Sequence, residues 1–115
     1  PNRKVMDIDN ALKIAINKKI NTLVSATKLN FPYEWAFSLK SNQNFYSFKS
    51  KYISKKKSQD YKNYYHLNGA IFIANVKYFK RFKTFHSKST YIFKTTFENS
   101  FDIDNYEDFR IAERF

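Results

Sequence analysis

Several residue types that mark common functional sites are absent from this sequence or nearly so. It has no cysteine, which excludes a disulfide scaffold and a thiolate-ligated metal site. Its single glycine, Gly69, excludes a glycine-rich loop that cradles nucleotide phosphates within these 115 residues. No apolar run approaches membrane-spanning length, and the first residues lack a signal-peptide pattern. We therefore expect a soluble cytoplasmic protein with no membrane partner.

Arginine and acidic residues are also scarce, whereas lysine is abundant. The chain has 17 Lys, 4 Arg and 10 acidic residues, and its formal net charge is +11. Such a charge suits nucleic acid, an anionic membrane surface or small anions. The abundance of Asn, Ile, Phe and Tyr indicates an A/T-rich coding bias, which accounts for much of the lysine. Arginine binds phosphate bidentately and is the better phosphate ligand, but this chain has few arginines. We therefore do not expect a nucleic-acid partner.

The lysine-aromatic stretches at residues 45–57 and 77–88 have two interpretations. Aromatic rings among cations can stack bases and hold phosphates. An ordinary amphipathic surface, with buried rings and snorkelling lysines, gives the same pattern and is the favoured interpretation. A small basic nucleic-acid-binding domain therefore stays open only as an alternative.

The apolar pattern predicts one α/β domain over residues 1–115. Apolar residues make up 43% of the chain, enough for a modest core. The periodicity predicts helices at residues 7–20, 75–82 and from 105 onward, and strands at 22–27, 35–39, 70–74 and 90–94. The first helix has an apolar face of Ile8, Ala11, Leu12, Ala15 and Ile16. Helices that alternate with strands are typical of an α/β layered structure.

Local capping signals mark the starts of two of these helices. Asn75 is expected to cap the helix at 75–82. Asn105 is expected to cap the last helix, with Asp108 three residues later as an approximate capping box. In that last helix, Phe109 and Ala112 are expected to face inward.

Two aspartates near the end of the chain, Asp102 and Asp104, suggest a metal site. On an extended backbone, side chains two residues apart point to the same face. Carboxylate oxygens are the ligands that Mg²⁺ prefers, and Mn²⁺ takes similar ones. An isolated Asp-x-Asp is more often a turn before a helix, so the pair needs support from elsewhere in the chain. The histidines, His66 and His86, have no ligand partner at a metal-binding spacing.

Support comes from the order of several short motifs along the chain. They are Asp7-Ile8-Asp9-Asn10-Ala11, Thr22-Leu23-Val24-Ser25-Ala26, Pro32-Tyr33-x-Trp35-Ala36-Phe37, Ser58-Gln59-Asp60, Tyr65-x-Leu67-Asn68-Gly69-Ala70-Ile71-Phe72-Ile73, Lys83-Thr84-Phe85-x-Ser87-Lys88, Phe101-Asp102-Ile103-Asp104 and Glu107-Asp108-Phe109-x-Ile111-Ala112-Glu113. In this order and spacing, over about residues 7–113, the chain resembles the C-terminal half of a bacterial acylneuraminate cytidylyltransferase. That family makes CMP-sialic and CMP-legionaminic acids.

The resemblance implies a fold, a reaction and a metal. The fold is a partial Rossmann-like nucleotidyltransferase with a protruding dimerisation arm at about residues 40–64. The aromatic-rich part of this arm, residues 45–53, would make the chain a homodimer. The reaction joins CTP to an acidic nine-carbon sugar, with Mg²⁺ held at the positions of Asp102 and Asp104. These two positions are also the catalytic ones.

The same resemblance assigns residues to the sugar side of the site. Asn68 contacts the sugar acid, Gly69 lets the backbone come close to it, and the segment around Phe85 lines the sugar side chain. The family has arginines where this chain has Ser58 and His66, and neither side chain binds a carboxylate as a guanidinium fork does. We expect Lys57, beside Ser58, to bind the sugar carboxylate in place of these arginines.

The family's CTP-binding strand and loop have no counterpart in these residues. We therefore expect the chain to be half of an enzyme and inactive by itself. A non-catalytic remnant that keeps an oligomerisation surface is the other alternative.

Overall fold

The computed structural model of the chain describes residues 3–36 and 61–115. The chain forms two compact units, one of residues 1–28 and 66–115 and one of residues 29–65. Most of the predicted dimerisation arm, together with Lys57 and Ser58, lies outside the described residues. Each unit is described by itself.

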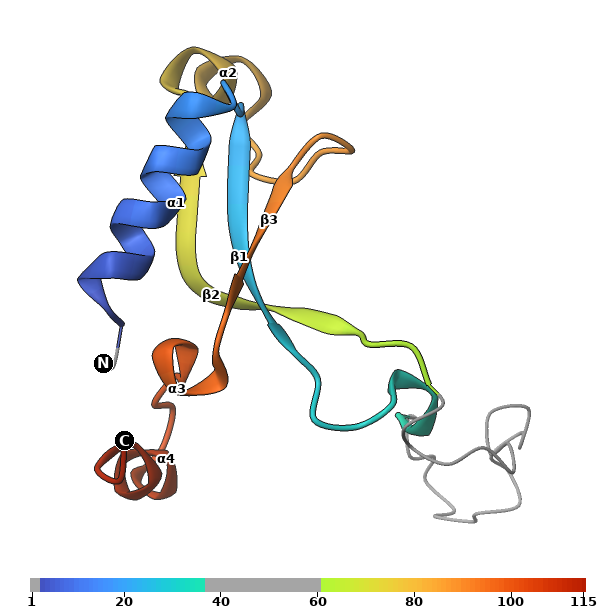
Figure 1. Cartoon of the computed structure of the whole chain (residues 1–115), viewed down its shortest axis with the longest axis vertical. Helices are drawn as coiled ribbons and strands as arrows, with labels where there is room; N and C mark the ends of the chain where they lie inside the picture. The colour runs from blue at the N-terminus through green and yellow to red at the C-terminus, as the bar shows by residue number, and fades with distance from the viewer. Residues whose placement is uncertain (1–2, 37–60) are drawn as a thin grey trace. The chain divides into compact units, whose positions relative to one another are not determined.

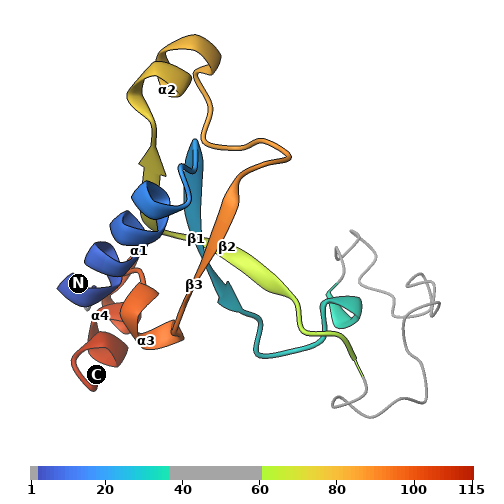
Figure 2. The same ribbon diagram turned by 45° about the horizontal axis from the view of Figure 1, so that its top comes forward.

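The first unit contains nearly all of the regular secondary structure that the structure describes (Figures 1 and 2). Its elements are α1 (Val5–Asn17), β1 (Thr22–Lys28), β2 (Tyr65–Ala74), α2 (Val76–Phe82), β3 (Tyr91–Thr95), α3 (Phe97–Ser100) and α4 (Tyr106–Ala112). The strands form one sheet in the order β2-β1-β3. β1 and β3 are parallel, in a register that runs from Leu23 opposite Tyr91 to Thr27 opposite Thr95. β2 runs in the opposite direction (Figure 1). The expected α/β class is confirmed.

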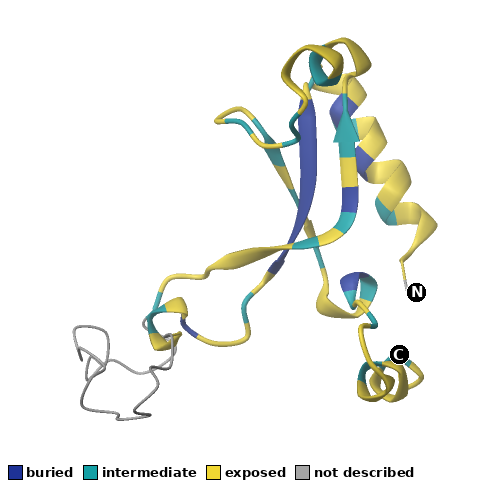
Figure 3. Ribbon diagram, turned by 180° about the vertical axis from the view of Figure 1, so that it is seen from behind, coloured by how far each residue is buried: buried dark blue, intermediate teal, exposed yellow. Residues whose placement is uncertain are grey.

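β1 is the buried centre of this unit (Figure 3). It lies between the two other strands, and Leu23 and Val24 are at most 1% exposed. The strand predicted at residues 22–27 is thus confirmed as a central strand. The strand predicted at 90–94 is also confirmed, one residue later, as β3.

α1 packs on the sheet through small side chains, which corrects the expected apolar face. Ala11 and Ala15 are buried and form the core with Leu23 and Ile71. The larger side chains expected beside them stay at the surface, where Ile8, Leu12 and Ile16 are 40%, 41% and 71% exposed. Small residues let the helix backbone approach the strands closely, whereas Ile8, Leu12 and Ile16 stay partly or largely exposed. The helix itself begins and ends earlier than the predicted range of 7–20.

Both predicted helix caps are confirmed. The Asn75 side chain accepts hydrogen bonds from the backbone N–H groups of Lys77 and Tyr78. Asn105 and Asp108 form a complete capping box at the start of α4. The expected inward face of α4 is wrong for Phe109, which is 46% exposed.

The described part of the second unit contains one short 3₁₀ helix, Tyr33–Trp35. A strand was predicted at 35–39, and residues 37–39 of it lie outside the described residues. The backbone N–H of Leu29 donates to the carbonyl of Tyr64, and the Tyr33 and Tyr64 rings lie 5.5 Å apart between centroids. The nearby Glu34 carboxylate raises the pKa of Tyr64, because ionising the phenol would place two negative charges side by side.

The close contact of α1 with the sheet gives a stability prediction. Ala11 is 0% exposed, so Ala11→Leu forces three extra carbon atoms into a filled interface and should lower the free energy of unfolding by about 1–3 kcal/mol. Lys13→Leu places the same side chain at an exposed position of the same helix and should change the stability little. Urea unfolding followed by circular dichroism compares the two, and equal effects would contradict this packing.

Candidate functional site

Polar side chains gather at the carboxyl ends of the two parallel strands. On β1, Ser25 and Thr27 are 1% and 3% exposed and share a face with Leu23. Thr95, opposite Thr27, is the last residue of β3, and Ser100 ends the short helix that follows. The core is thus apolar where α1 covers it and polar at this end. In open α/β sheets, ligands bind outside the carboxyl ends of the strands.

The amide of Asn68 on β2 connects all three strands. Its nitrogen donates to the hydroxyls of Thr27, at 2.6 Å, and Thr95, at 2.7 Å. Its oxygen accepts from the Ser25 hydroxyl, at 2.6 Å, and from the backbone N–H of Ala70, at 3.1 Å. A carboxamide has two donors and two acceptor positions, so all four are occupied by the protein itself. Asn68 is therefore positioned as a structural crosslink.

The hydroxyl groups beside Asn68 form a chain of hydrogen bonds that are all donated in the same direction. Ser100 donates its proton to the carbonyl of Thr96, at 2.8 Å. The 2.8 Å contact between Thr27 and Ser100 is then donated by Thr27, and the 3.2 Å contact between Thr95 and Thr27 is donated by Thr95. Since each hydroxyl has a single proton, this is the arrangement that satisfies all three. The chain fixes the first helix after β3 against β1.

Gly69 lies near the middle of β2, a strand that bends along its length (Figure 1). Its φ is +68°, in the left-handed region that favours glycine. The next N–H groups donate to side chains, Ala70 to the amide oxygen of Asn68 and Ile71 to the Ser25 hydroxyl, at 2.8 Å. This pattern is typical of a β-bulge. A Cβ on Gly69 would meet no described protein atom within 4 Å, so its conformation, and not crowding by the protein, requires glycine.

Asp102 and Asp104 follow the polar cluster, in the segment between α3 and α4. Both are exposed, while Ile103 between them is partly buried, as expected for an extended segment with both carboxylates on the outer side. Asp108 holds this segment by accepting hydrogen bonds from the backbone N–H groups of Asp104 and Asn105. Among the described residues, no three His, Cys, Asp or Glu side chains are grouped to hold a metal. The pair alone offers two hard oxygen ligands.

The other expected sugar-side residues are spread over the unit. His66 is an exposed residue of β2 whose Nδ1 lies 3.2 Å from the carbonyl of Leu67. Phe85 packs on Phe72, at 5.2 Å between ring centroids, and its carbonyl accepts from Thr90 just before β3 begins. Phe85 therefore lies at the opposite end of β3 from the aspartates. The assignments of His66, Phe85 and Lys57 to a sugar site stay predictions.

The sequence analysis missed the hydroxyl side chains that surround Asn68. A signal was present, because Ser25 and Thr27 occupy the same alternating face as Leu23 in the strand predicted at 22–27. Hydroxyls on the core side of a buried strand need partners. Asn68 was identified, but through the resemblance and with a different role.

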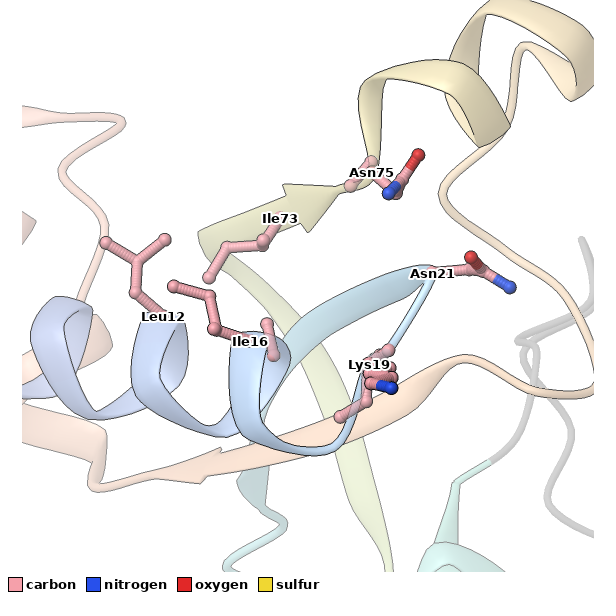
Figure 4. A pocket seen from close by; sticks show the side chains of 9 residues that line it. Leu12, Ile16, Lys19, Asn21, Ile73 and Asn75 are labelled. Carbon is pink, nitrogen blue, oxygen red and sulfur yellow. The ribbon is translucent and has the colours of Figure 1, made fainter.

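A groove lies at the other end of the sheet (Figure 4). It has a volume of about 520 Å³ and lies between the end of α1 and the end of β2. Leu12, Ile16 and Ile73 form its apolar wall, and Lys19, Asn21 and Asn75 are the polar side chains that line it. None of the expected site residues lines this groove.

Comparison with known proteins gives no assignment. No protein-family model matches the chain, and a search of curated proteins finds no relative. Of the helices that the structure describes, none has the length and apolar character needed to cross a membrane.

The Asn68 crosslink predicts a large stability effect. Asn68→Leu removes all four hydrogen bonds and takes away the acceptor of the Ser25 hydroxyl and of the Ala70 N–H, so the free energy of unfolding should fall by at least about 2 kcal/mol. Asn17→Leu, at an exposed position of α1, is the matched control and should stay within about 0.5 kcal/mol. Urea unfolding measures both, and a stable Asn68→Leu chain would leave this residue free for a ligand role.

Proposed function

We propose that this chain contributes the sugar side and the metal side of CTP-dependent cytidylyl transfer to an acidic nine-carbon sugar. The order of the motifs supports this function by resemblance to acylneuraminate cytidylyltransferases. One structural observation agrees with it. The Asn68 crosslink ties β2 to the carboxyl ends of β1 and β3, and the Asp102–Asp104 segment follows from that same end. This is where ligands bind in Rossmann-like sheets, the finer fold that we also propose here.

The proposed reaction needs positioned phosphates and an acidic site beside them. The sugar hydroxyl attacks the α-phosphorus of CTP, the bond to the β-phosphate oxygen breaks, and pyrophosphate and a proton leave. The chemistry of the donor set fits Mg²⁺, because Asp102 and Asp104 offer exposed carboxylates and phosphates and water would complete six oxygen ligands. A bound Mg²⁺ supplies neutralisation of charge on the triphosphate and the leaving group. The residues around Asn68 keep the strands in place behind this segment.

The proposal gives the chain no means of holding CTP by itself. The one glycine of the sequence, Gly69, is part of the bend in β2, so these residues contain no glycine-rich phosphate loop. Positioning supplies most of phosphoryl-transfer catalysis. In this proposal, a second polypeptide that carries such a loop must therefore be supplied to hold CTP.

Reconstitution tests the activity. The 115-residue chain, mixed with CTP, Mg²⁺ and an acidic nine-carbon sugar, should release no more pyrophosphate than a control without protein. Addition of the N-terminal half of a related cytidylyltransferase should give turnover. Asp104→Asn should abolish that turnover because it removes a metal-ligand charge, whereas Glu107→Gln, an exposed carboxyl in the first turn of α4, should preserve it.

Two outcomes would replace this proposal. Turnover by the chain alone would show that the CTP site lies within these residues. A half that binds the chain without restoring turnover would support the alternative of a non-catalytic remnant with an interaction surface. The exposed aliphatic side chains of α1, Ile8, Leu12 and Ile16, are the observation that favours this alternative.

Metal binding can be tested without activity. Two carboxylates supply few of the ligands that an octahedral cation needs, so Mn²⁺ should bind weakly and broaden the amide NMR signals of residues 100–106 without saturating at micromolar concentrations. The double variant Asp102→Asn/Asp104→Asn should lose this broadening, and Glu107→Gln/Glu113→Gln should keep it. Broadening that survives in the first double variant would show that the cation does not bind at the aspartate pair.

A further inference from the structure

The acidic residues of the first unit are confined to one of its ends. Its described acidic residues lie in the first half of α1 or after β3, and residues 10–28 and 66–97 contain none. Seven of its described lysines and arginines lie just after α1, in α2 and in the segment that follows it. They are Lys18, Lys19, Lys77, Lys80, Arg81, Lys83 and Lys88, a set that we call the basic end.

The fold brings the parts of the basic end together. The backbone N–H of Asn75, just before α2, donates to the carbonyl of Asn21, just after α1, at 2.8 Å. The hydroxyls of Thr22 and Thr90 lie 2.9 Å apart and join the start of β1 to the start of β3. All seven cations are exposed. A coding bias toward lysine explains how many lysines there are, but it does not explain why acidic residues are missing from one end.

α2 adds an exposed aromatic surface to these cations. One side of the helix is anchored, because Phe79 packs on Phe85 at 4.8 Å between ring centroids. On another side Phe82 is 50% exposed, and it is supported by Tyr78, whose ring centroid lies 4.6 Å away. The Arg81 guanidinium carbon lies 5.0 Å from the centroid of the Phe82 ring. A half-exposed ring that is braced by a neighbouring ring and has a guanidinium beside it is a surface on which a base can stack.

We propose that the basic end binds single-stranded nucleic acid, a function separate from the proposed cytidylyl transfer. The lysines and Arg81 neutralise backbone phosphates, and an unpaired base stacks on Phe82. α2 has seven residues and is only about 10 Å long, too short to follow the major groove of a duplex. With one arginine in the set, bidentate contacts to base edges are few, and binding is tolerant of sequence.

Fluorescence anisotropy with a labelled oligothymidylate of about 20 nucleotides tests the proposal on the 115-residue chain. Binding should weaken by at least about 10-fold between low salt and physiological salt, because counterions are released from several phosphates. Lys80→Glu/Arg81→Glu should weaken binding by about 10-fold or more. Arg110→Glu/Arg114→Glu is the matched control, since it changes the net charge by the same amount at the acidic end and should cost less than about 3-fold.

The stacking step has its own variants. Phe82→Ala should weaken binding by about 5-fold or more, and Phe82→Trp should retain it, because base stacking on a ring contributes about 1–3 kcal/mol per base. A duplex of the same length should bind more weakly than the single strand. Circular dichroism confirms that each variant is folded.

Three results would overturn the proposal. Absence of oligothymidylate binding at low salt would contradict the proposed nucleic-acid binding. Equal losses in the two charge-reversal variants would show attraction by the net charge of the whole chain and not by the basic end. Unchanged binding by Phe82→Ala, with duplex bound as well as the single strand, would show a surface for phosphate polyanions without base stacking.

Discussion

The amide of Asn68 is the interaction on which the sheet of this protein depends. A partly buried carboxamide must satisfy two donors and two acceptors, and this one does so with Ser25, Thr27, Thr95 and the backbone of Ala70. Three of its four bonds join β2 to β1 and to β3, two strands away, and the fourth is to Ala70 on β2 itself. The glycine that follows has a positive φ, and the next two N–H groups donate to the side chains of Asn68 and Ser25. Bend, amide and hydroxyls are therefore one cooperative unit.

The two ends of the sheet differ. At the carboxyl ends of β1 and β3, the hydroxyl chain holds α3 in place, and the exposed aspartates follow. At the opposite end, the residues just after α1, α2 and the segment after it carry exposed cations, and Phe82 of α2 is half-exposed. The proposed metal site and the proposed nucleic-acid surface occupy different ends. Their tests are accordingly independent, and either function can fail without affecting the other.

The elements that local signals control were predicted well. Asn75 and Asn105 were identified as helix caps because a cap bonds to N–H groups only two or three residues away. β1 was identified because six consecutive small or aliphatic residues suit a central strand. The apolar face of α1 was predicted only in part. Helical spacing shows which side chains share a face, but the sheet selected Ala11 and Ala15 from that face because only small side chains allow its close approach.

By itself, the sequence determined the absence of thiol chemistry and of a glycine-rich loop. It also determined the α/β class, the helix caps and the spacing of Asp102 and Asp104. The tertiary structure alone decided what Asn68 bonds to and where the charges gather. The partners of Asn68 on β1 lie 41 and 43 residues away along the chain, and those contacts require the strand register to be set first. Charge separation likewise follows from which segments the sheet places at each end. Such contacts depend on strand order and loop closure, which short-range residue patterns do not specify.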